Sequence, residues 1–67
     1  MPKFLINGKE RELADVQSLR EILTCLDVDP GTVVVEHNES VVPRTALSTT
    51  PVHSGDKIEI VQFVGGG

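Results

Sequence analysis

The chain has 67 residues, of which ten are acidic and six are basic, so its formal net charge is −4. A chain this short buries only about 60% of its unfolded surface, so we expect a single domain over residues 1–67. The negative charge has the wrong sign for a protein that binds a phosphate backbone, and no apolar run approaches the roughly 20 residues that span a bilayer. We therefore expect neither a nucleic-acid partner nor a membrane partner.

Cys25 is the only cysteine, and no group of His, Cys or carboxylate side chains has the spacing of a metal site. Hydrophobic packing alone is therefore expected to hold the fold. No Lys, Arg or His lies three or four residues from Cys25 to stabilise a thiolate, so we expect a small hydrophobe there rather than a nucleophile. A lone cysteine and an N-terminus without a charged-then-apolar leader predict a cytoplasmic protein.

The first element in chain order is a hairpin in the stretch "KFLINGKEREL". Asn7 and Gly8 supply the positive φ values that a tight two-residue turn requires, so we expect a strand on each side of them. Successive side chains of a strand point to opposite faces, which places Phe4 and Ile6 on one face and Leu5 on the other.

An amphipathic helix is predicted next, in "SLREILTCL". Ser18 can cap its N-terminus and Glu21, three residues later, can complete a capping box. One apolar stripe follows at helical spacing: Leu19, Ile22, Leu23 and Leu26. The segment 27–31, which contains Pro30 and Gly31, ends the helix.

The second half of the chain predicts three more strands. "TVVVEHN" is a β-branched run, Val41 and Val42 form a short return strand that ends at Pro43, and "KIEIVQFV" is the last and strongest strand. Residues 44–51 are expected to form a loop or one helical turn. The order predicts an α+β fold in which a mixed sheet of four to five strands packs on one main helix and leaves its other face open.

The last strand divides its side chains between the two faces of this sheet. Ile58 and Ile60 are expected to pack under the helix, whereas Val61 and Phe63 lie on the open face. Leu5 would join them if the first and last strands are neighbours. Exposed apolar patches often mark protein contacts, so we favour an interface here over chance exposure.

No catalytic group emerges from the sequence. "HSGD" contains His53, Ser54 and Asp56, but neighbours in sequence rarely meet the geometry of a triad, and the stretch is typical of a turn. The terminal "GGG" is not followed by a helix, so it is not a phosphate-binding loop. The feature that remains is a strand that runs directly into three glycines.

These residues resemble the ThiS family of sulfur carrier proteins of thiamine biosynthesis. The resemblance covers essentially the whole chain and is strongest in "VEHNESVVPR" and in "SGDKIEIVQFVGGG", although "HNES" stands where that family often has an Asn-Gly turn. It implies a ubiquitin-like β-grasp domain that is a protein substrate rather than an enzyme, that binds no cofactor and that is monomeric when free.

The resemblance also implies a role for the C-terminal tail, residues 64–67. The carboxylate of Gly67 would be adenylated with ATP by a ThiF-type adenylyltransferase and converted, with a sulfur-donating enzyme, to a thiocarboxylate. A ThiG-type thiazole synthase would receive the sulfur. Gly65 and Gly66 would complete the tail motif, and Val64 would join the partner-binding surface of Leu5, Val61 and Phe63.

The physical chemistry of the tail agrees with this role. A C-terminal carboxylate is ionised at neutral pH and is a poor acyl donor until it is activated. Glycine lacks a Cβ, so such a backbone can thread a narrow channel. Four residues extend roughly 13 to 14 Å, enough to enter another protein's active site.

Two alternatives remain open from the sequence. One is a MoaD-type sulfur carrier subunit of molybdopterin synthase, although those proteins tend to be longer and to approach the final glycines differently, often through proline. The other is a ubiquitin-like binding module that carries no sulfur and whose glycines are an ordinary chain end.

Overall fold

The computed structural model describes residues 1–63, and residues 64–67 lie outside the described part of the chain. The strands are β1 (Lys3–Ile6), β2 (Lys9–Glu12), β3 (Val33–His37), β4 (Ser40–Val42) and β5 (Lys57–Gln62). They form one sheet in the order β2-β1-β5-β3-β4. Helix α1 (Leu19–Cys25) and the 3₁₀ segments η1 (Pro30–Thr32) and η2 (Arg44–Thr49) complete the fold. The predicted mixed sheet on one main helix is confirmed.

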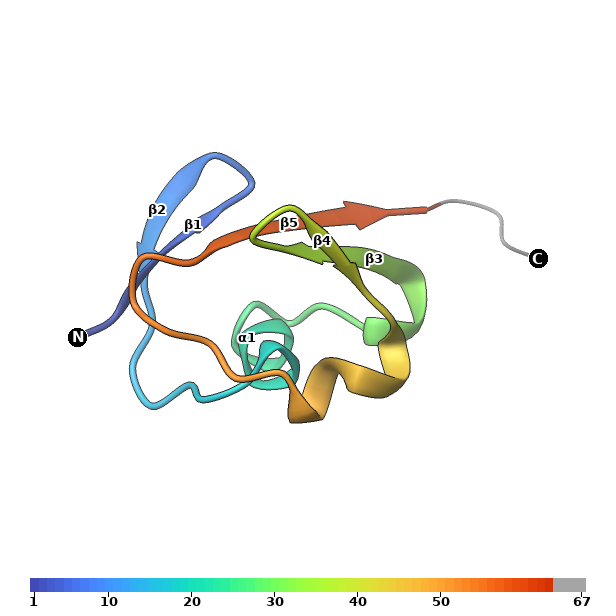
Figure 1. The fold of residues 1–67 in the computed structure, drawn as a ribbon, viewed down its shortest axis with the longest axis horizontal. Coiled ribbons are helices and arrows are strands. Elements are labelled where there is room, and N and C mark those ends of the chain that lie inside the picture. Colours follow the sequence, from blue (N-terminus) through green and yellow to red (C-terminus); the bar gives the residue numbers. More distant parts are fainter. Residues whose placement is uncertain (64–67) are drawn as a thin grey trace.

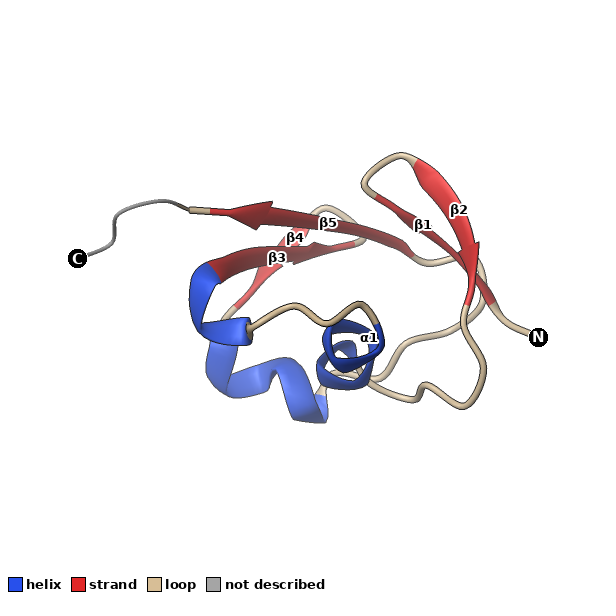
Figure 2. Ribbon diagram, turned by 180° about the vertical axis from the view of Figure 1, so that it is seen from behind, coloured by secondary structure: helices blue, strands red, loops and turns tan. Residues whose placement is uncertain are grey.

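The sheet has one covered face and one open face. Helix α1 and η2 lie on the same side of the strands, and no described element lies on the other side (Figure 1; Figure 2 shows the same arrangement from behind). We call the side covered by α1 the inner face and the opposite side the outer face. The middle strand, β5, pairs in parallel with β1 and antiparallel with β3.

Two tight hairpins build the edges of the sheet. The β1–β2 turn has positive φ at both central residues, Asn7 (50°) and Gly8 (81°), as its sequence predicts. The β3–β4 turn uses Asn38 (50°) and Glu39 (74°) in the same way. Glu39 therefore occupies a left-handed conformation that costs a residue with a Cβ roughly 1–2 kcal/mol.

Helix α1 begins at the predicted cap. The Ser18 hydroxyl accepts a hydrogen bond from the Glu21 N–H at 3.2 Å. The expected capping box is altered in one respect: the Glu21 carboxylate accepts a 2.7 Å bond from the N–H of Gln17, one residue before the cap. Leu26 is the C-terminal cap of the helix and donates to the Ile22 carbonyl.

The core lies between α1, η2 and the inner face. Its most deeply buried side chains are large and apolar, and they come from every layer: Phe4, Leu19, Ile22, Leu23, Val35, Leu47 and Ile58. At the margin of this core, four further apolar side chains are partly buried against it: Leu26, Val28, Val42 and Ile60. Hydrophobic burial of this kind stabilises a domain without disulfides by about 25 cal/mol per Å² of apolar area.

Residues 44–51, expected as a loop or one helical turn, form the six-residue 3₁₀ segment η2 and a short bridge. Leu47 of η2 enters the core, and Pro51 pairs with Ser18. This return path covers the part of the inner face that the seven residues of α1 leave open. Within residues 1–63, no helix has the length and hydropathy needed to cross a membrane.

Candidate functional site

The last strand ends beside η1. The N–H of Phe63, the final described residue, donates to the carbonyl of Thr32 at 3.1 Å. The chain is therefore held in the sheet up to the residue before the tail. The predicted tail residues Val64, Gly65, Gly66 and Gly67 lie outside the described residues.

An apolar patch covers the outer face at this end of β5. In the β3–β5 register Val34 lies directly opposite Val61, and both are about half exposed (42% and 57%). Phe63 (47%) and Val41 (65%) extend it along β5 and onto β4. We call these four residues the outer-face patch. The outward orientation of Val61 and Phe63 is as predicted, and Val34 and Val41 are additions.

The sequence contained the signal for these additions. Alternation along "TVVVEHN" places Val34 on the face opposite Val33 and Val35, both of which are buried. The sequence pattern did not show that β3 pairs with β5, and this pairing is what places Val34 beside Val61.

Leu5 lies on the outer face but away from the patch. The first and last strands are neighbours, as its inclusion required, yet the register pairs Leu5 with Lys57. Val61 lies four residues farther along β5, roughly 13 Å at about 3.3 Å per residue. The register of the β1–β5 pairing therefore keeps Leu5 away from Val61 and Phe63, and Leu5 is not part of their patch.

Acidic side chains adjoin the outer-face patch. Glu36 and Glu59 are directly opposite each other in the β3–β5 ladder, one step from Val34 and Val61 on the same face. Like charges opposite one another in a sheet are destabilising in the isolated protein. The outer-face patch is therefore apolar and has negative charge beside it. This combination suits a partner surface that is apolar with basic residues next to it.

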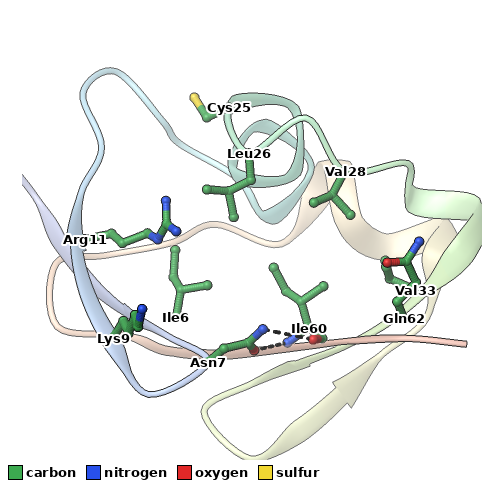
Figure 3. Close-up of a pocket in the computed structure, with 10 residues that line it drawn as sticks. All are labelled: Ile6, Asn7, Lys9, Arg11, Cys25, Leu26, Val28, Val33, Ile60 and Gln62. Atoms are coloured by element: carbon green, nitrogen blue, oxygen red, sulfur yellow. Dashed lines mark hydrogen bonds between the residues drawn. The ribbon is translucent and has the colours of Figure 1, made fainter.

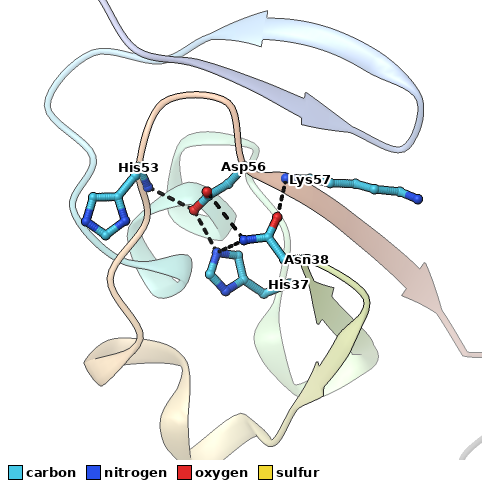
Figure 4. Close-up of polar contacts among 5 residues, drawn as sticks. All are labelled: His37, Asn38, His53, Asp56 and Lys57. Atoms are coloured by element: carbon cyan, nitrogen blue, oxygen red, sulfur yellow. Dashed lines mark hydrogen bonds and ion pairs between the residues drawn. The ribbon is translucent and has the colours of Figure 1, made fainter.

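The other end of β5 is anchored by a polar cluster (Figure 4). The Nε2 atom of His37 lies 2.7 Å from the Asp56 carboxylate, and both side chains are largely buried. The same carboxylate accepts the backbone N–H of His53 at 2.9 Å. Burial by itself would raise the pKa of Asp56, but the hydrogen bonds to its carboxylate, chiefly from His37, outweigh burial and hold that pKa below its ordinary value.

Asn38 connects this cluster to the backbone of β5. Its side-chain oxygen accepts the Lys57 N–H at 2.9 Å, and its own N–H donates to the Lys57 carbonyl at 2.8 Å. The "HSGD" stretch is confirmed as a turn, with Gly55 at a φ of 95°. The pairing of His37 with Asp56 was missed because 19 residues separate them.

A second asparagine holds the middle of the strand. The Asn7 carboxamide accepts the N–H of Ile60 at 2.7 Å and donates to the Ile60 carbonyl at 3.1 Å. These two bonds extend the β1–β5 ladder by one step beyond the end of β1. Asn7 thus serves both the hairpin turn and the last strand.

The described residues form no metal-ligand cluster, and their His–Asp pair belongs to a turn. Among residues 1–63 no three His, Cys, Asp or Glu side chains cluster as metal ligands. Both His37 and Asp56 are occupied with each other and with the turn. Cys25 is exposed at the C-terminal end of α1 rather than packed as a small hydrophobe. The notable features are the anchored strand, the outer-face patch and the tail that follows.

Comparison with known proteins decides the family. The sequence profile of the ThiS family matches residues 4–67, which is nearly the whole chain and includes the tail. The chain belongs to the ThiS family. Its sequence and fold are those of a ThiS-type sulfur carrier of thiamine biosynthesis with a ubiquitin-like β-grasp, as the resemblance implied.

Individual relatives agree with the ThiS assignment. The crystal structure of the thiamine biosynthesis protein ThiS from Geobacter metallireducens superposes with a TM-score of 0.82 at 34% identity, covering 97% of this chain and 99% of that one. The sulfur carrier protein ThiS of Bacillus subtilis is 30% identical over 63 residues, or 92% of this chain and 96% of that protein.

One group of relatives is much longer than this ThiS-family chain. A thiazole synthase of Paramagnetospirillum magneticum is 42% identical over 65 residues, which are 97% of this chain but 20% of that protein. The chain thus spans about one fifth of the length of this relative. A thiazole synthase of Magnetococcus marinus shows the same relation at 34% identity.

Proposed function

We propose that this ThiS-type carrier transports sulfur on the carboxylate of Gly67. The observation that carries the proposal is the ThiS family match, which runs through the last residue and thus includes the whole "VGGG" tail. The tail follows a strand that is held in the sheet up to Phe63, so the domain supplies a firm base for it.

The chemistry requires activation by a partner. A carboxylate oxygen of Gly67 attacks the α-phosphate of ATP in a ThiF-type adenylyltransferase, and pyrophosphate leaves. Sulfide (HS⁻) released by a sulfur-donating enzyme then attacks the acyl-adenylate carbonyl and displaces AMP with loss of a proton, which yields the thiocarboxylate. Adenylation is needed because the ionised carboxylate alone is a poor acyl donor. On this proposal ATP is bound by the partner, and the carrier itself holds no cofactor.

The outer-face patch is the proposed docking surface for these partners. It adjoins the start of the tail, and its exposed Val34, Val61 and Phe63 provide apolar area for a protein contact. The neighbouring Glu36 and Glu59 favour a basic partner face. Val64 would continue the contact toward the active site, whereas Leu5 would contact a partner only at the periphery.

A thiazole synthase of the ThiG type is the proposed acceptor of the sulfur. Support comes from the thiazole synthases that contain a segment similar to this chain, since covalent joining holds a carrier at high effective concentration beside its acceptor. The free carrier is expected to act as a monomer in the cytoplasm, because one copy must pass between several enzymes.

Intact-mass spectrometry tests the carrier role. After incubation with ATP, the adenylyltransferase and a sulfur source, we expect the mass to rise by the difference between one sulfur and one oxygen, with fragmentation placing the change on Gly67. A variant with one alanine appended after Gly67 is the matched control, because it keeps the fold but moves the carboxylate. An unmodified native chain, or full modification of the extended one, would contradict the mechanism and favour a binding module without sulfur chemistry.

A further inference from the structure

A groove lies on the inner side of the sheet, between the C-terminal end of α1 and the strands β2 and β5 (Figure 3). Its volume is about 530 Å³. Apolar side chains from the C-cap of α1, the following loop and the sheet form its floor: Ile6, Leu26, Val28, Val33 and Ile60. Cys25 lies at its rim. The groove is therefore on the opposite side of β5 from the outer-face patch.

Two cations form one wall of the groove. Lys9 and Arg11 lie opposite Ile6 and Phe4 in the β1–β2 ladder, and directly paired residues share a face, so both cations are on the inner face. Arg11 reaches toward the end of α1 in Figure 3. Within residues 1–63, neither cation has an ion-pair partner and no carboxylate lines the groove. On a chain of net charge −4, this wall is a local positive region.

The third feature of the groove is an open strand edge. Backbone groups along β5 alternate between its two neighbours: Phe63 bonds toward β3, whereas Ile58 and Ile60 bond toward β1. Beyond Ile60 the first strand has ended, with the Asn7 side chain as its last contact. The N–H and C=O of Gln62 face the side where β1 no longer runs, and Gln62 lines the groove.

We propose that this groove is a second docking surface, which binds an extended acidic segment of a partner protein. The backbone of the segment pairs with Gln62, one of its apolar side chains enters between Leu26 and Val28, and its carboxylate meets Lys9 and Arg11. Addition of a strand to an open edge is an established mode of peptide recognition. A small anion would engage the cations but leave the backbone edge and the apolar floor unused, so a peptide segment fits the three features better.

The location gives this surface a distinct use. Because the groove and the outer-face patch are on opposite sides of β5, a protein bound to the patch leaves the groove accessible. The groove includes Gln62 and the outer-face patch includes Phe63, the last two described residues. Two partners can therefore hold the carrier at the same time, one on each face. The inference concerns a binding surface and does not depend on modification of Gly67.

A titration of the ¹⁵N-labelled chain followed by NMR tests the proposal. The probe is the peptide acetyl-Asp-Val-Glu-Leu-amide, and the matched control replaces both acidic residues by lysine. A short peptide in a shallow groove is expected to bind with a Kd of about 1 mM. We expect shifts at the amides of Lys9, Arg11, Val28 and Gln62 with the acidic peptide, weakening as salt is raised, and none with the basic peptide.

Variants assign the binding to the groove. The double substitution Lys9→Glu and Arg11→Glu is expected to reduce affinity more than tenfold, and Lys9→Gln with Arg11→Gln provides a neutral version should charge reversal disturb the hairpin. Lys3→Glu reverses a single charge on the outer face of the same hairpin and should leave binding unaltered, whereas Lys9→Glu alone, the charge-matched variant, should weaken it. The dispersion of the amide spectrum of each variant verifies its fold.

Three outcomes overturn the proposal. The first is an absence of shifts at the groove at about 5 mM acidic peptide, several times the expected Kd. The second is equal binding of both peptides, or shifts confined to Val34 and Val61. The third is that inorganic phosphate alone produces the whole set of shifts, Gln62 included, which would assign the groove to small anions. Formation of the thiocarboxylate is measured separately and can succeed or fail independently.

Discussion

The two ends of β5 differ in how they are held and in what they present. At its start Ile58 is fully buried, and the cluster of His37, Asn38 and Asp56 secures the turn that leads into the strand. At its end Val61 and Phe63 are exposed, and the contacts are backbone bonds to β3 and η1. The start of β5 therefore contributes to stability, whereas its exposed end is the part proposed to contact partners. Substitutions at the start should lower the free energy of unfolding, and those at the end should weaken binding.

The largest expected effect is at the buried start of the strand. Ile58→Ala removes core contacts and leaves a cavity, so we expect the free energy of unfolding to fall by about 2–5 kcal/mol. Val61→Ala, the same kind of truncation on the exposed half, should cost no more than about 0.5 kcal/mol. Chemical denaturation of both variants measures the difference. Equal losses would remove the distinction between the two ends.

The next effect concerns the polar anchor. Asp56→Asn replaces a buried hydrogen-bonded carboxylate, and we expect a loss of about 1–3 kcal/mol at neutral pH. The folded pKa of Asp56 lies below its unfolded value of about 3.9, so its contribution is complete above that value and is lost as the pH falls through the folded pKa. Denaturation at several pH values should show a stability decline below about pH 4 that is smaller in the variant. An identical decline would mean that other carboxylates cause it.

The exposed end should respond in binding rather than in stability. Phe63→Ala is expected to weaken binding to the adenylyltransferase by about tenfold, which corresponds to about 1.4 kcal/mol, with a smaller change in unfolding free energy. Isothermal titration and thermal denaturation of the same samples supply the two values. Leu5→Ala is the matched control, because Leu5 is exposed on the same face but lies beside Lys57. Unchanged affinity in the Phe63 variant would show that the patch is ordinary surface.

The smallest effect tests the hairpin next to the anchor. Glu39→Gly relieves a left-handed conformation (φ 74°), so we expect a gain of about 1 kcal/mol. The variant also loses an exposed 3.5 Å contact of Glu39 with Lys57, which is worth less than about 0.5 kcal/mol. A thermal midpoint that rises without a change in partner binding would confirm this balance. A lower midpoint would show that the ion pair outweighs the strain.

The sequence predicted local elements well where a short motif carries the cause. The Asn7-Gly8 pair correctly predicted the first hairpin, and Ser18 correctly predicted the start of α1. The alternation of side chains along the last strand correctly placed Ile58 in the core and Val61 on the surface. It failed where two distant segments meet. Nothing local states that His37 faces Asp56, or that Leu5 is opposite Lys57 rather than Val61.

The sequence by itself determined the two hairpins and the helix, because each depends on periodicity or backbone freedom within a few residues. Only the tertiary structure added Val34 and Val41 to the outer-face patch and assembled the groove. Both depend on strand order and register, which place Val34 beside Val61 and bring Lys9 and Arg11 to the same side of β5 as Leu26. Register is set by how the whole core packs, and that information is distributed over the chain.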